Sequence, residues 1–232
     1  MILAAHQPNY LPYIGFFHKA MMCDVFVIAD HVQYTKKEWQ NRNKIRTKCG
    51  CIWLTVPVIS KNHFQQRIGE VNIDNSVNWA DTHWKSIFYN YVKAPFFGSY
   101  KKFFKEIYSQ KWEKLLDLNE AIIYHILKEL NIKAKVVKSS TLNLEGSKTD
   151  LLVGMCKKMN ADTYISGIGA KNYIEEEPFK NENIKLLFQD FCHSVYPQRF
   201  DSFIPNMSVI DLLFNVGSDK AREIISKSSG IQ

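Results

Sequence analysis

The sequence predicts an α/β fold: a mostly parallel, doubly wound, Rossmann-like sheet with a helical insertion at about residues 79–130. Three observations lead to this prediction. The chain opens with the pattern strand, loop, helix, strand; residues 79–130 carry apolar side chains at helical spacing; and a further helix and strand over residues 147–165 run into a glycine loop. A chain of 232 residues with 46% apolar content can bury one substantial core, so we expect a single domain over residues 1–232.

The opening segment contains the first strand–helix–strand unit. Met1 to Ala5 is a short apolar run, and Pro8 and Pro12 exclude regular structure from the loop that follows it. Residues 14–22 permit a helix, and Val25 to Ala29 is apolar throughout, as a buried strand is. Because parallel strands need a crossover connection, we expect these two strands to be parallel.

Residues 30–50 are polar and basic and show no clean periodicity, so the sequence predicts a long loop there. Unstructured connections above about 12 residues are uncommon unless they bind something. The following run, Cys51 to Val58, is strand-like and is interrupted near its end by Pro57.

Three helices are expected within the insertion, with Pro95 and Gly98 separating the first from the second. Asn131 ends the third helix, and Ala134 to Lys138 is the next strand.

The last part of the chain continues the alternation of helices and strands. Residues 147–159 are amphipathic, with Ser147 or Thr149 as the N-terminal cap of the helix. Strands are expected at residues 163–165 and 184–188, a loop at 196–205, and a final helix at 208–215, capped by Ser208 and followed by Gly217.

Polar residues follow several of the predicted strands, where ligands bind in open parallel sheets. These residues are His6, Gln7 and Tyr10 after the first strand, Asp30, His31 and Gln33 after the second, and Ser166, Gly167 and Gly169 after a later one. We expect the three groups to converge on one cleft.

His6 and Asp30 are the two candidate catalytic residues. An imidazole titrates near neutral pH, so His6 can act as a general base, although a loop histidine can also be purely structural. Asp30 can activate an amine or orient a sugar hydroxyl, or it can simply cap a turn. The sequence leaves open which of the two is the base.

Further residues are candidates for substrate binding. Asn41, Arg42 and Asn43 offer amide and guanidinium groups suited to phosphate or carboxylate. In the glycine loop, Gly167 and Gly169 permit close approach of a phosphate or sugar to the backbone. The remaining candidates are Tyr173, just beyond that loop, and His193, Tyr196 and Gln198, which follow the last strand.

Charge and cysteine content narrow the class of protein. A net charge of +7 favours phosphate-bearing partners, but the lysines are spread along the chain, which makes a nucleic-acid partner a poor expectation. The five cysteines predict neither a disulfide framework nor a zinc site, and no other metal site is expected. No apolar run reaches the length of a membrane span, so we expect a cytoplasmic protein.

Five segments of the sequence resemble the WbqC-like family of bacterial O-antigen and surface-polysaccharide gene clusters. They are HQPNYLPYIGFFHKAMMCDVFVIADHVQY, NRNKI, WLTVPV, YISGIGAKNYI and FIPNMSVIDLLFNVG. The resemblance implies a step in making or decorating a nucleotide-linked sugar. The chain departs from its relatives at His31, where they tend to have a second acidic residue, and this weakens a two-carboxylate metal site.

A more distant similarity is to nucleotidylyltransferases of the HxGH class. Residues 13–16, Tyr-Ile-Gly-Phe, would occupy the place of the signature, and both of its histidines are missing. The fold can therefore be shared while adenylyl transfer is not.

The resemblance and the candidate residues together predict transfer of an acyl or aminoacyl group to the amine of a nucleotide-linked amino sugar. The expected donor is the thioester of acyl-CoA or of an acyl carrier protein, which would make the carrier a partner. Two alternatives stay open: a nucleotidylyltransferase-like enzyme or ATP-dependent ligase, and a non-catalytic binding module in a biosynthetic complex.

Overall fold

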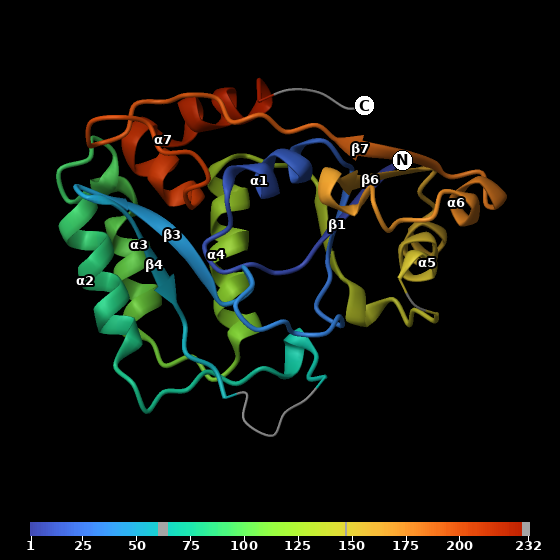
Figure 1. The fold of residues 1–232 in the computed structure, drawn as a ribbon, viewed down its shortest axis with the longest axis horizontal. Coiled ribbons are helices and arrows are strands. Elements are labelled where there is room, and N and C mark those ends of the chain that lie inside the picture. Colours follow the sequence, from blue (N-terminus) through green and yellow to red (C-terminus); the bar gives the residue numbers. More distant parts are fainter. Residues whose placement is uncertain (60–64, 147, 229–232) are drawn as a thin grey trace.

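The computed structural model describes residues 1–59, 65–146 and 148–228 (Figure 1). In chain order, the strands and α-helices are β1 (Ile2–His6), α1 (Ile14–Met21), β2 (Val25–Ile28), β3 (Arg42–Thr47), β4 (Gly50–Thr55), α2 (Trp79–Tyr91), α3 (Phe97–Ser109), α4 (Leu115–Glu129), β5 (Lys135–Lys138), α5 (Thr149–Met159), β6 (Thr163–Gly167), α6 (Glu177–Asn181), β7 (Lys185–Gln189) and α7 (Val209–Ser226).

The main sheet has five strands in the order β5-β2-β1-β6-β7, and every neighbouring pair is parallel. From β1 the chain adds β2 and then β5 on one side, and afterwards β6 and β7 on the other. The direction of winding therefore reverses between β1 and β6, which makes the carboxyl ends of these two strands the switch point of the sheet. The predicted Rossmann-like α/β fold is confirmed.

Both faces of the sheet are covered. Figure 1 shows α5 and α6 on one face and α1 and α4 on the other. Alternate residues of β1 supply the two cores: Leu3 packs in the cluster with α5 and α6, and Ala4 packs in the larger cluster with α1 and α4. A strand buried on both faces must be apolar throughout, which is why β1 and β2 could be recognised from the sequence.

The predicted loop over residues 30–50 is wrong in its second half. β3 and β4 form an antiparallel hairpin outside the main sheet, in which Arg42 pairs with Thr55. The strand pattern of β3 is hidden because its buried positions include Asn43 and Arg46. Asn43 Nδ2 donates to the Leu11 carbonyl at 2.6 Å, so this polar side chain is satisfied in the interior without an apolar signal.

The helical insertion contains the three expected helices, α2, α3 and α4. They pack with α7 beside the hairpin, away from the edge formed by β7 (Figure 1). An aromatic cluster joins them, because the rings of Tyr91, Phe97 and Phe104 lie 5.2, 5.2 and 5.5 Å from that of Phe214. Edge-to-face pairs of this kind add to the stabilisation from burial alone.

Helix termini differ in part from the predictions. Ser208 caps α7 as predicted, with its side chain accepting a hydrogen bond from the Ile210 amide. The predicted stop at Gly217 is instead a kink, after which the helix continues to Ser226. Thr149 is the first residue of α5 and not its cap, and the alternative cap Ser147 lies outside the described residues.

Replacing Gly217 by alanine should lower the free energy of unfolding by about 1–3 kcal/mol, the cost of holding a side chain in a backbone region that only glycine readily adopts. Gly217 has φ 77° and ψ 171°, and a Cβ there would lie 2.8 Å from the Phe96 ring. Gly98→Ala is the matched control, since nothing lies within 4 Å of its added Cβ on α3. Urea unfolding measures both variants; equal stability of the two would contradict the prediction.

Among the described residues, no helix combines the length and the apolar character needed to cross a membrane.

Candidate active site at the switch point

A cavity of about 560 Å³ lies at the carboxyl ends of β1, β2 and β6. Its polar lining includes His6, Gln7, Lys19, His31, Ser166 and Gly167. The opposite wall is largely apolar and includes Leu152 and Met155 of α5. This is the position where open parallel sheets bind their ligands, and the volume suits a small organic molecule.

His6 ends β1 and is held as a neutral ring. Its Nδ1–H donates to the Gln7 carbonyl at 2.9 Å, which leaves Nε2 as the proton acceptor. Burial and the nearby charge of Lys19 lower the pKa of His6 to about 3, against a weaker opposing effect of the bond to Gln7. The ring also packs against Phe16, with 4.8 Å between centroids. An uncharged imidazole therefore lines the cavity at physiological pH.

Lys19 extends from α1 to the same point and is only 5% exposed. Its Nζ donates to the Ala5 carbonyl at 3.4 Å, a long hydrogen bond. Burial lowers the pKa of Lys19 to about 8, and no ion pair involves it within the described part of the chain. A Cβ on Gly167 would come within 3.4 Å of Nζ, so glycine leaves the ammonium room. A buried cation without a carboxylate partner is suited to an anionic ligand.

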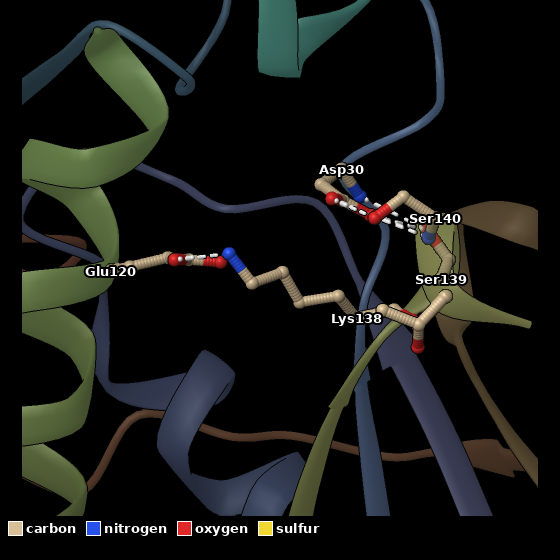
Figure 2. Close-up of polar contacts among 6 residues, drawn as sticks. Asp30, Glu120, Lys138, Ser139 and Ser140 are labelled. Atoms are coloured by element: carbon tan, nitrogen blue, oxygen red, sulfur yellow. Dashed lines mark hydrogen bonds and ion pairs between the residues drawn. The ribbon is translucent and has the colours of Figure 1, made fainter.

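Asp30 is not among the residues that line the cavity, and its carboxylate points toward Ser139 and Ser140 (Figure 2). Its Oδ1 accepts hydrogen bonds from Ser139 Oγ at 2.8 Å and from the Ser140 amide at 2.9 Å, and its Oδ2 accepts from Ser140 Oγ at 2.6 Å. Burial raises the pKa of Asp30, but the hydrogen bonds from Ser140 and Ser139 together bring it below its ordinary value. A carboxylate so fully bonded is a poor base and a good anchor between the ends of β2 and β5.

Close to this anchor, Lys138 extends from β5 toward Glu120 of α4, with 2.9 Å between Nζ and Oε2 (Figure 2). Burial raises the pKa of Glu120, and the bond from Lys138 opposes that rise. The ion pair joins the sheet to the helical insertion beside the site.

The loop after β2 is fastened to the end of β1 by amide side chains. Gln40 Nε2 donates to Gln7 Oε1 at 2.7 Å, and Gln40 Oε1 accepts from the Thr35 amide at 2.9 Å. Trp39, from the same loop, lines the cavity, and its ring lies 5.3 Å from that of Trp53 on the hairpin. The loop thus brings an aromatic side chain to the mouth of the site.

Five of the residues predicted for the site line the cavity: His6, Gln7, Ser166, Gly167 and Tyr173. Asp30 does not line the cavity, but its sequence neighbours Ala29 and His31 do. Together with His31, which follows β2, these five residues bring polar groups from the ends of β1, β2 and β6 to one cavity.

Several other predicted residues lie elsewhere, because the structure uses their polar groups internally. Tyr10 is fully buried, with its hydroxyl 2.8 Å from His83 Nδ1 and 2.5 Å from the Tyr108 hydroxyl. Asn41 Nδ2 donates to the Val56 carbonyl, and Asn43 is bonded to the Leu11 carbonyl. These side chains hold the hairpin and the opening loop together.

Arg42 does not reach the cavity, since its guanidinium lies over the Trp53 ring, 4.4 Å from the centroid, and donates to the Lys37 carbonyl. Gln33 pairs with Arg67 in an isolated β-bridge. Gly169 is in a short 3-10 turn and is not itself among the lining residues, although Ala170 of the same turn is.

The residues predicted after the last strand belong to a separate structural cluster. Tyr196 and Gln198 both donate to Asp211 Oδ2, at 2.8 and 2.9 Å, and Asp211 is on α7. His193 packs against Phe191, with 4.8 Å between ring centroids. None of the three is among the residues that line the cavity.

Sequence reasoning missed Lys19 and Trp39, which both line the cavity. The signal for Lys19 was its place in IGFFHKAM, a helix that is buried from Ile14 to Ala20. A lysine in so apolar a segment is expected to be buried, and lysines are almost never buried unless their charge is paired with another group. His31 was expected at the cleft together with the other polar residues that follow β2, and it is among the residues that line the cavity.

Comparison with known proteins gives a consistent result. The model of the WbqC-like protein family matches residues 7–223. The chain is 36% identical over 219 residues to a protein of Mycobacterium tuberculosis (strain ATCC 25618 / H37Rv) named "Uncharacterized protein Rv1507c", and the match covers 94% of each chain. No solved structure gives a significant match. The chain belongs to the WbqC-like protein family.

Proposed function

We propose that the chain binds a nucleotide-linked amino sugar in the switch-point cavity and transfers an acyl or aminoacyl group from a thioester to its amine. The observation that carries the proposal is the pairing of a buried lysine with a neutral histidine in one cavity at the switch point. A cation for phosphate and a base for an amine are the two groups that such a transfer requires of the protein.

His6 is the proposed base. The free amine attacks the thioester carbonyl carbon, a C–N bond forms, and the C–S bond breaks. His6 Nε2 accepts the proton that the amine loses and returns it to the departing thiolate, which leaves as a thiol. The products are an amide and a thiol, and no covalent enzyme intermediate is needed.

Lys19 is the proposed phosphate ligand in place of Arg42. Burial is the larger cause of the low pKa of His6, and the charge of Lys19 is the second. A diphosphate bound at Lys19 neutralises that charge, so the substrate itself raises the basicity of His6. The base is therefore strengthened only when the phosphate-bearing substrate is in place.

The apolar wall formed by Leu152 and Met155 fits the acyl group of a thioester donor. The donor remains acyl-CoA or an acyl carrier protein, as expected from the sequence. An acyl chain against this wall would point its carbonyl toward the polar lining that holds His6.

The test combines binding with turnover. Wild type should bind UDP-glucosamine in isothermal titration calorimetry, and the addition of acyl-CoA should release free thiol. Lys19→Met should weaken binding at about pH 7 by roughly ten- to a hundredfold, which is the affinity lost when a hydrogen bond to a charged group is removed. Lys85→Met, at an exposed site on α2, is the control and should bind as wild type does.

The same experiment has a pH arm. Because the pKa of Lys19 is about 8 in the folded chain, affinity should fall as pH rises through that value, and Lys19→Met should not show the fall. The unfolded chain keeps this proton to higher pH, so the ligand-free protein should become more stable above about pH 8. Binding of an ATP analogue but not of UDP-glucosamine, with pyrophosphate release, would favour a nucleotidylyl transfer. Binding of neither ligand would contradict the proposal.

A further inference from the structure

Ser139 Oγ lies among four polar groups and has a single proton to give. It is 2.8 Å from Asp30 Oδ1, 2.5 Å from His31 Nδ1, 3.1 Å from the Asp30 amide and 3.5 Å from the His31 amide. The two amides can only donate, so they leave the Ser139 proton to be divided between Asp30 and His31.

The carboxylate receives that proton. Asp30 Oδ1 also accepts from the Ser140 amide, and its hydrogen bonds hold its pKa below the ordinary value, so Asp30 is ionised and cannot donate. If Ser139 gave its proton to His31, two unprotonated oxygens would face each other at 2.8 Å in a buried place. The chain of donation therefore runs from His31 Nδ1–H to Ser139 and from Ser139 to Asp30.

This direction determines the tautomer of His31. With its proton on Nδ1, the neutral ring carries a lone pair on Nε2. Nε2 is buried and has no hydrogen-bond partner among the described residues, and His31 is one of the residues that line the switch-point cavity. A buried acceptor without a partner is costly, and a ligand that supplies a donor removes the cost.

We infer that His31 Nε2 is a binding site for an O–H or N–H donor on the ligand of this cavity, and that Asp30 and Ser139 are positioning residues which keep that nitrogen unprotonated. The inference rests on the proposed function for the identity of the ligand, in which the donor is a hydroxyl or the amine of the sugar. His31 is then distinct from His6: it orients the sugar, while His6 removes the proton.

The first measurement is independent of any ligand. Nitrogen-15 NMR of the imidazole groups should show His31 in the Nδ1–H tautomer in wild type. Ser139→Ala removes the acceptor of that proton and should shift His31 toward the Nε2–H tautomer. Asp30→Asn is the milder control, because its amide oxygen can still accept from Ser139 Oγ, and it should largely preserve the wild-type tautomer.

The second measurement uses UDP-glucosamine as the probe. His31→Phe keeps a flat ring without an acceptor and should bind about tenfold more weakly, which is the affinity lost with one hydrogen bond. His31→Gln offers an amide oxygen as acceptor and should recover part of this loss. UDP-2-deoxyglucose, which has no hydrogen-bond donor at carbon 2, shows which sugar group donates to His31. If His31→Phe binds this probe as tightly as wild type does, the donor is the group at carbon 2. If His31→Phe still binds it more weakly, the donor is another sugar hydroxyl.

The outcomes separate this inference from the function on which it rests. An Nε2–H tautomer in wild type, or equal affinity of wild type and His31→Phe, would overturn the inference while leaving nucleotide-sugar binding in place. A wild-type chain that binds neither probe would overturn the proposed function and a sugar donor at His31 along with it.

Discussion

Replacing His6 by glutamine is expected to lower the rate of acyl transfer about 10²- to 10⁴-fold, the range that general-base catalysis contributes. Glutamine keeps a polar side chain of similar length but cannot accept a proton at neutral pH. Substrate affinity should change far less, because Lys19 and the remaining lining residues are intact. Single-turnover assays of thiol release measure the loss.

The control is His125→Gln. His125 lies on α4 with its ring stacked on Phe103 at 3.5 Å between centroids, and it is not among the residues lining the cavity. A His6→Gln variant as active as this control would remove His6 from the reaction. In the ligand-free protein, His6 should not titrate between about pH 5 and pH 8, and Lys19→Met should raise its pKa because the opposing charge is gone.

Replacing Asp211 by leucine should lower the free energy of unfolding by about 3 kcal/mol or more, because buried donors lose their acceptor. Asp211 is fully buried, and its carboxylate accepts from Tyr91 at 2.7 Å and from Tyr196 and Gln198. For a chain of this size the loss corresponds to a fall in Tm of about 6–12 °C.

Two further variants make this prediction specific. Asp211→Asn keeps one acceptor oxygen and should cost less than the leucine variant. Asp219→Ala removes an exposed carboxylate from the same helix and should be near neutral. Calorimetry measures the melting temperatures of the three variants. Equal melting temperatures for Asp211→Leu and Asp219→Ala would contradict the assignment.

The polar site at the switch point was predictable for a reason that needs no side-chain detail. His6 and Ser166 each stand at or near the end of an apolar strand, and parallel strands present all their carboxyl ends at one edge of the sheet. Once β1 and β6 were recognised, the approach of these residues followed from topology.

The same reasoning failed for Tyr10 and Tyr196, which are polar and follow predicted strands but form hydrogen bonds with other parts of the protein. Their partners, such as Tyr108 for Tyr10 and Asp211 for Tyr196, are distant in the sequence. A polar residue gives no sign in the sequence of whether its hydrogen bonds are made to a ligand or to the protein.

By itself the sequence determined the five strands of the parallel sheet, the three helices of the insertion and the edge where polar side chains gather, because these depend on hydrophobic periodicity and on rules of chain connection. Only the tertiary structure decided that Lys19 reaches that edge as a buried cation, that Asp30 is an anchor, and that Ser139 orients His31. The ionisation of a group and the direction of its hydrogen bonds depend on burial and on neighbours brought together from distant segments, and that information exists only once the chain has folded.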